Sequence, residues 1–268
     1  MSPRESSCQA RSVEDNRVGT IRRQPSIRRF NYRREIQMLE PEGRVVMISG
    51  ARRGLGRAIA ERLLSSGYTI SAGIRDTTRL PDHPRFFAYQ YDATVPEDGE
   101  RWVATTVERL GRIDAVINAA GISVRGRLLD HDESAFDAMW ETNTKAPMRV
   151  IRAAWPYLAV SGEGRIVNLS SLSGKRVRND NLAYAMSKFA IMALTHETRR
   201  LGWDLGIRAT ALCPGFVDTD MTANVTKLPR SQMSRPEDIA SVVETVLRLS
   251  NSASIAEVLV NCRHEDML

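Results

Sequence analysis

Short apolar runs alternate with amphipathic segments along most of this chain, and that alternation limits its possible folds more than any other feature. The runs are rich in β-branched residues, as buried strands are, and the segments between them space their apolar residues as a helix does. We predict strands at 44–48, 68–74, 86–91, 113–118, 165–171, 207–212 and 257–261. We predict helices at 55–66, 96–110, 133–158 and 236–249, with a further helix that carries Tyr184. Regular alternation of this kind predicts an α/β fold with a single doubly wound parallel sheet and helices on both of its faces.

The length of 268 residues suits one large α/β domain and is short for two. We therefore predict a single domain over residues 43–268. Residues 1–42 have a different character, because Arg pairs are separated there by Ser and Pro without sustained periodicity, and we expect a basic, disordered tail. A transit peptide is also rich in Arg and Ser, but acidic residues in this segment argue against one. Translation from Met38 would remove most of the tail.

The net charge of +6 raises the question of a nucleic-acid partner. Nine Arg, no Lys and five acidic residues lie in the first 40 positions, which therefore carry +4 and leave only +2 for the rest. The basic charge is concentrated in the tail, and we expect no nucleic-acid partner. No apolar run approaches the ~18 residues of a membrane helix, so we expect a soluble protein with no membrane partner. Cys8, Cys213 and Cys262 are far apart and odd in number, which predicts a cytoplasmic protein with neither disulfides nor a metal site.

A phenol and an ammonium group lie one helical turn apart at Tyr184 and Lys188. A phenol titrates near ~10, and a nearby cation favours its phenolate form, which would make Tyr184 a better acid or base near neutral pH. Such pairs also arise by chance on amphipathic helices. Ser171 strengthens the functional interpretation, because it ends a predicted strand and open α/β sheets bind their ligands at that edge.

A glycine-rich turn joins the first predicted strand to the first helix, with Gly50, Gly54 and Gly56 spaced as Gly-x-x-x-Gly-x-Gly. Glycines allow close approach of a ligand to the backbone, and the free N–H groups of a helix N-terminus favour a pyrophosphate. Glycines also simply interrupt loops, so this motif is weak when taken alone. Its place in the first strand-turn-helix unit favours a dinucleotide.

Together these motifs resemble the short-chain dehydrogenase/reductase family, specifically its compact single-domain members, from about residue 44 to the end. Ser49 occupies the place of the family's usual Thr before the glycines, and Asn118-Ala119-Ala120-Gly121 is similar to its Asn-Asn-Ala-Gly signature. Pro214-Gly215 with Thr219 resembles the element that contacts the nicotinamide. The C-terminus lacks the Asp-Gly-Gly ending of many relatives, which puts in doubt a substrate or subunit contact usually made there.

The resemblance implies an oxidoreductase that interconverts a ketone or aldehyde and an alcohol. Tyr184 would exchange a proton with the substrate oxygen, Ser171 would hold that oxygen, and Lys188 would favour the phenolate and bind the nicotinamide ribose. Asn143 would position a water that connects Lys188 to solvent. The implied catalytic residues are Asn143, Ser171, Tyr184 and Lys188. The implied cofactor-binding residues are Ser49, Gly50, Arg53, Gly54, Leu55, Gly56, Arg75, Asp92, Ala93, Asn118, Ala119, Gly121, Tyr184, Lys188, Pro214, Gly215 and Thr219. A merely structural role is the alternative for two of them: Asn143 as a polar residue that kinks a helix, and Ser171 as a cap at a strand end.

The end of the second strand predicts which nicotinamide is used. The family's spacing puts a ribose-binding carboxylate at position 74, but Ile74 stands there and Arg75 follows, placed to pair with the 2′-phosphate of NADP. Arg53 would supply a second cation on the same side. Asp76 is the counter-evidence, because it could reach the ribose in a shifted register. We therefore expect NADP(H) in preference to NAD(H).

Substrate identity should depend on the loops 122–130, 172–183 and 217–235. Five cationic side chains in the first two loops could attract an anionic substrate, although ordinary solvated surface charge is the commoner role for each: Arg125, Arg127, Lys175, Arg176 and Arg178. The resemblance also implies a homodimer or homotetramer that pairs through helices at 136–158 and 184–201. The alternative to an enzyme is a protein of the same fold that binds the dinucleotide as a sensor or interaction partner.

Overall fold

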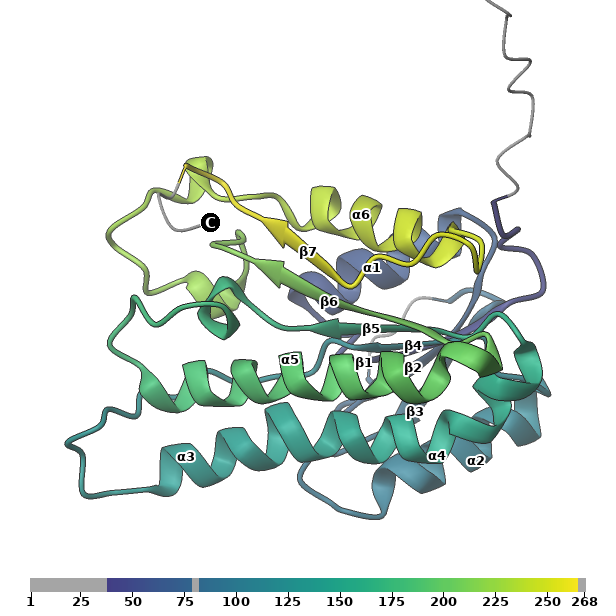
Figure 1. Ribbon diagram of the computed structural model, residues 1–268, viewed down its shortest axis with the longest axis horizontal. Coiled ribbons are helices and arrows are strands. Elements are labelled where there is room, and N and C mark those ends of the chain that lie inside the picture. The colour runs from purple at the N-terminus through teal and green to yellow at the C-terminus, as the bar shows by residue number, and fades with distance from the viewer. Residues whose placement is uncertain (1–37, 79–81, 265–268) are drawn as a thin grey trace, which may run out of the picture. The chain divides into compact units, whose positions relative to one another are not determined.

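The computed structural model of the protein describes residues 38–78 and 82–264, so the prediction of a disordered tail falls almost entirely outside the described residues. Seven parallel strands form one sheet in the order β3-β2-β1-β4-β5-β6-β7 (Figure 1). The strands are β1 Val45–Ser49, β2 Thr69–Ile74, β3 Phe86–Gln90, β4 Ala115–Asn118, β5 Arg165–Leu169, β6 Arg208–Pro214 and β7 Glu257–Val260. The longer helices are α1 Gly54–Ser65, α2 Asp98–Leu110, α4 Ala146–Ser161, α5 Leu182–Gly202 and α6 Pro236–Arg248. This doubly wound arrangement confirms the predicted fold class, and no described helix is long and apolar enough to cross a membrane.

Two apolar cores lie on opposite faces of the sheet, because successive side chains of a strand point to opposite faces. Ile48 packs with α1 and α6 in one core, and Met47 packs with α2 and α4 in the other. The inner strands are buried on both faces, as β1 is along its whole length, whereas β3 and β7 at the two ends of the sheet are only partly buried. Strands of this kind read as continuous apolar runs, which is why the sequence marked them clearly.

The predicted helix over 133–158 is wrong in one respect, because it is not a continuous α-helix. A π-helical turn at Trp140–Lys145 separates α3, Ser134–Met139, from α4. Asn143 lies in this turn, 1% exposed, and its side-chain amide both donates to and accepts from the backbone of Ile122, each at 2.9 Å. The π-helical turn thus occurs where Asn143 contacts a distant loop. The apolar periodicity along the helix does not reveal such contacts, so the sequence did not predict this turn.

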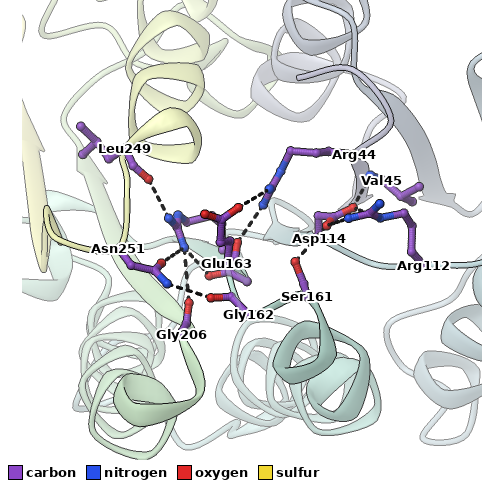
Figure 2. Close-up of polar contacts among 12 residues, drawn as sticks. Arg44, Val45, Arg112, Asp114, Ser161, Gly162, Glu163, Gly206, Leu249 and Asn251 are labelled. Carbon is purple, nitrogen blue, oxygen red and sulfur yellow. Dashed lines mark hydrogen bonds and ion pairs between the residues drawn. The ribbon is translucent and has the colours of Figure 1, made fainter. Parts of the chain in front are cut away.

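A buried carboxylate organises the edge of the sheet where the strands begin, opposite the edge that carries the predicted site (Figure 2). Asp114, 1% exposed, accepts hydrogen bonds from the Val45 backbone N–H and the Ser161 hydroxyl, both at 2.9 Å. The Arg112 guanidinium pairs with the same carboxylate through two nitrogens, at 2.8 and 2.7 Å. One side chain therefore ties the start of β1 to the end of α4.

Replacing Asp114 with Ala is expected to lower the free energy of unfolding by about 3 kcal/mol, because the buried Val45 N–H loses its acceptor and Arg112 its partner. Urea unfolding followed by circular dichroism measures this loss. Asp204→Ala is the matched control, since Asp204 is exposed and its loss should change stability by less than about 0.5 kcal/mol. Equal effects of the two substitutions would show that Asp114 has no special structural role.

Candidate active site

The glycine turn after β1 has no room for side chains. Gly50 has φ +73°, and a Cβ there would lie 2.9 Å from the Ala120 Cα. A Cβ on Gly56 would lie 2.3 Å from the Gly50 carbonyl oxygen, closer than any real contact. Gly54 has φ +55°, a backbone conformation that favours glycine. These glycines let the turn pack closely against the ends of β1 and β4. No side chain caps the start of α1, and its N–H groups and dipole fit a pyrophosphate.

The Ser49 and Asn118 side chains brace the sheet edge next to this turn. The Ser49 hydroxyl accepts hydrogen bonds from the Ala119 and Ala120 N–H groups, both at 3.1 Å, and so joins the ends of β1 and β4. The Asn118 amide donates to the Asn168 side chain at 2.8 Å. Their part at a dinucleotide site would be to fix the backbone that contacts it.

The second strand, β2, ends at the residue where the sequence predicted that it ends. Ile74 is the last residue of the strand, and the exposed Arg75 follows it. Arg75 borders a hollow of about 430 Å³ that is also lined by Tyr89, Gln90, Tyr91, Asp92 and Asp98. Within the described ranges Arg75 forms no ion pair, and its charge helps to lower the pKa of Asp92, after the larger effect of hydrogen bonds from Thr94.

The guanidinium next to the end of β2 belongs to Arg52, whereas Arg53 was expected on this side. Arg53 does not approach the end of β2, because its guanidinium lies 3.5 Å from the carboxylate of Asp220, in the loop after β6. Arg52 reaches the end of β2 instead, with its guanidinium 2.9 Å from the Asp76 carboxylate. Sequence reasoning missed Arg52, because adjacent residues of an irregular turn point in directions that only the folded backbone determines.

Tyr184, Lys188 and Ser171 meet at the carboxyl edge of the sheet, as predicted. Lys188 is 6% exposed, donates a hydrogen bond to the Leu169 carbonyl at 2.7 Å, and holds its Nζ 5.5 Å from the centroid of the Tyr184 ring. Ser171 lies two residues after the end of β5 and also caps a short 3-10 turn, since its hydroxyl accepts a hydrogen bond from the Ser173 N–H at 3.1 Å. The cap proposed as its structural alternative is therefore present, and it orients the hydroxyl.

Burial sets the protonation of the two titratable groups. It raises the pKa of Tyr184 to about 12, and a hydrogen bond with Ser171 opposes the rise. It lowers the pKa of Lys188 to about 8, and an electrostatic interaction with the nearby Cys213 side chain opposes this change. The pKa of Tyr184 therefore lies above its ordinary value, whereas the ammonium alone was expected to lower it. At neutral pH the phenol is protonated and can donate its proton.

Asn143 lies beside this group through its own contacts. Its amide donates to the Ser187 hydroxyl at 3.1 Å, and its side-chain oxygen lies 3.2 Å from where a Gly121 Cβ would stand. The Lys188 Nζ lies 3.9 Å from that same point. The Asn143 amide is thus engaged in holding Ile122 and Ser187 in place close to Lys188.

The other cofactor residues predicted from the resemblance lie at the same edge. The Gly215 N–H donates to the Val260 carbonyl at 2.8 Å, and the Thr219 methyl lies 3.5 Å from where a Gly54 Cβ would stand, so the loop after β6 reaches the glycine turn. The Asp92 carboxylate accepts from the Thr94 N–H and hydroxyl at 2.9 and 2.8 Å. The remaining members lie in or beside these elements: Leu55 at the start of α1, Ala93 after Asp92, and Pro214 at the end of β6.

The cationic loop residues are largely paired. Arg125 and Arg127 share one carboxylate, that of Asp180, with Arg127 at 3.1 Å. Lys175 lies 2.6 Å from Glu257, which also lies 3.0 Å from His196. Much of the charge proposed for attracting an anionic substrate is therefore compensated within the protein. No group of side chains suited to a metal ion occurs among residues 38–78 and 82–264.

Comparison with known proteins identifies the family of this chain. A match to the family described as short chain dehydrogenase covers residues 44–229. An agropine synthesis reductase from Rhizobium rhizogenes is 38% identical over 83% of this chain, but the match spans only 53% of that protein, so the chain spans about half the length of this curated relative. An uncharacterized oxidoreductase from Staphylococcus epidermidis is 29% identical over 83% of this chain and 99% of its own length.

A solved structure extends the likeness to three dimensions. The short chain dehydrogenase from Burkholderia cenocepacia in complex with NADP has a TM-score of 0.74 and 28% identity, over 83% of this chain and 90% of that one. Both the matched residues and the fold include the whole edge that carries the glycine turn, Ser171, Tyr184 and Lys188. The chain therefore belongs to the short-chain dehydrogenase family.

Proposed function

We propose that the protein interconverts a carbonyl compound and an alcohol with a nicotinamide dinucleotide, using Tyr184 as the proton donor and acceptor. The observation that carries the proposal is the convergence of a protonated phenol, an oriented hydroxyl and a buried ammonium at the edge of the sheet that also carries the glycine turn and the uncapped N-terminus of α1. When bound, the nicotinamide would supply or accept the hydride.

The proposed roles follow from the contacts. Ser171 holds the substrate oxygen, and Tyr184 gives its proton to that oxygen during reduction or takes it back during oxidation. Lys188, anchored on the Leu169 carbonyl, provides a positive charge beside the phenol that opposes the cost of forming phenolate. Asn143 fixes the loop at Ile122 and the helix at Ser187 around this ammonium. A water positioned at Asn143 would return protons from solvent to Lys188.

The test is a screen of purified protein against ketones, aldehydes and secondary alcohols with NADPH, NADH, NADP⁺ or NAD⁺. Turnover of at least one class, lost in Tyr184→Phe, supports the proposal. Tight dinucleotide binding without turnover across the panel would instead support the alternative, a sensor or interaction protein of this fold. Retention of both Tyr184 and Lys188 favours the enzyme, because a protein that only binds the dinucleotide needs no proton donor.

We propose NADP(H) as the preferred cofactor, because the exposed Arg75 follows the last residue of β2 and forms no ion pair in the described structure. Arg75→Ala should lower kcat/KM with NADPH by roughly 10- to 150-fold, the equivalent of one charge-assisted hydrogen bond, and leave kcat/KM with NADH nearly unchanged. Steady-state kinetics with each cofactor measure this difference. An equal loss with both cofactors, or a wild type that prefers NADH, would contradict the assignment.

We also propose a homodimer or homotetramer that pairs through α4 and α5. Ile151 and Leu158 point into the core, but Val160 is 88% exposed on α4 and Phe189 is 44% exposed on α5. Light scattering at micromolar concentration should give a multiple of 30.0 kDa, and Phe189→Asp should shift the mass toward the monomer. Leu205→Asp, at a residue that is 43% exposed beyond the end of α5, is the control. A monomeric wild type would refute the assembly.

A further inference from the structure

Arg52 and Asp76 form an ion pair at the edge of the proposed cofactor site. The Arg52 guanidinium lies 2.9 Å from Asp76 Oδ2, donates to the Asp76 carbonyl at 3.0 Å, and also donates to the Thr78 carbonyl. The other carboxylate oxygen, Oδ1, accepts from the Thr78 N–H at 2.9 Å and from its hydroxyl at 2.7 Å. Both oxygens of Asp76 are therefore occupied by groups of the protein itself.

This pair bears directly on the choice between the two nicotinamide dinucleotides. Asp76 comes two residues after the end of β2, next to Arg75, where a ribose-binding carboxylate would favour NAD and repel the 2′-phosphate of NADP. The Arg52 guanidinium compensates the charge of that carboxylate and occupies the oxygen that Thr78 leaves open. The Asp76 carboxylate, next to Arg75 in the chain, is then already paired with Arg52 and does not compensate the positive charge of Arg75.

Resting on the proposed dinucleotide function, we infer that Arg52 sets the cofactor preference by neutralising and restraining Asp76, so that the selectivity belongs to the Arg52–Asp76 pair rather than to either residue alone. Loss of Arg52 frees a carboxylate that can bind a ribose diol and repels a 2′-phosphate. When the Asp76 charge is lost, Arg52 no longer has a carboxylate to neutralise. The two substitutions therefore act in opposite directions, and the first depends on the presence of Asp76.

The experiment measures binding of 2′,5′-ADP and of 5′-AMP to the full chain by isothermal titration calorimetry, at one fixed ionic strength. The variants are Arg52→Gln, Asp76→Asn and the double variant, and Arg57→Gln is the matched control. Arg57 is an exposed Arg on α1 whose carboxylate partner, Glu61, lies 2.7 Å away on the same helix. Thermal unfolding of each variant establishes that it is folded, which is expected because Arg52 and Asp76 are substantially exposed.

The quantity compared is the ratio of the affinity for 2′,5′-ADP to the affinity for 5′-AMP. Arg52→Gln should lower this ratio about 10-fold or more, Asp76→Asn should raise it several-fold, and Arg57→Gln should not change it. In the Asp76→Asn background the Arg52→Gln substitution should change the ratio less than about 3-fold. Such non-additivity is the signature of two residues that act as a unit.

Additive effects in the double variant would overturn the inference, because they would mean that Arg52 acts on the phosphate independently of Asp76. A lower ratio in Asp76→Asn would overturn it as well. These outcomes are distinct from failure of the proposed function. If the wild type binds none of the four nucleotides 2′,5′-ADP, 5′-AMP, NADP⁺ and NAD⁺, the proposed function fails and this inference fails with it. If the nucleotides bind but Arg52→Gln leaves the affinity ratio unchanged, only the inference is overturned.

Discussion

Tyr184→Phe is expected to lower kcat by roughly 10²–10⁴-fold, the range that a positioned acid-base group contributes. The substitution removes one oxygen atom and keeps the ring that lies 5.5 Å from the Lys188 Nζ, so the shape of the site should persist. Burial already holds the pKa of Tyr184 at about 12, and the variant therefore loses a proton donor without losing a charge. The dinucleotide dissociation constant should change little, because the glycine turn is untouched.

The measurement is kcat with the best substrate from the carbonyl and alcohol panel, together with a fluorescence titration of the cofactor. Tyr157→Phe is the matched control, since Tyr157 is 37% exposed on α4, away from Ser171 and Lys188. Only the Tyr184 substitution should reduce turnover. If Tyr184→Phe retains wild-type kcat, the phenol is not the proton donor and the proposed mechanism is wrong.

Lys188→Met is expected to abolish most turnover and yet to stabilise the fold near pH 7. Holding the pKa of a buried ammonium at about 8 instead of 10.5 costs the charged form about 3 kcal/mol. Loss of the hydrogen bond to the Leu169 carbonyl offsets about 1–1.5 kcal/mol of that gain. The variant should therefore be about 1–2 kcal/mol more stable than the wild type below pH 8. Stability and activity are opposed at this residue.

The direction of the pH dependence follows from proton binding. The unfolded chain binds the Lys188 proton more tightly than the folded chain, so the wild type gains stability as the pH rises from about 8 to 10.5. The advantage of Lys188→Met should shrink over that window. Urea unfolding at pH 7 and pH 9.5 measures it, with Lys227→Met at an exposed lysine as the control that should show no such change. A constant difference between wild type and Lys188→Met at both pH values would show that Lys188 is not desolvated.

Much of the site could be predicted from sequence because its parts are local. Tyr184 and Lys188 share a helix face whatever the rest of the chain does, and a β-branched run followed by glycines forms a strand, a turn and a helix wherever it is packed. The end of β2 at Ile74 was predictable for the same reason, since the alternation of apolar and small residues over 68–74 is local. Parallel topology then brings the carboxyl ends of β1, β2 and β5 to one edge.

Other features depended on contacts between distant segments. Arg52 rather than Arg53 reaches Asp76, the turn around Asn143 is π-helical, and Asp180 neutralises Arg125 and Arg127 across two loops. The pKa of Tyr184 is raised, whereas the sequence predicted a lowered value, because desolvation depends on everything packed around the phenol.

The sequence alone determined the order of strands and helices, since periodicity along each segment encodes it. Through the family resemblance it also marked the four catalytic candidates and the absence of a carboxylate at position 74. Only the tertiary structure decided which charges are compensated, which polar side chains are free to meet a ligand and which protonation states burial favours. Those properties depend on distances and solvent exclusion between residues far apart in the chain, and these arise only when the sheet and its helices pack together.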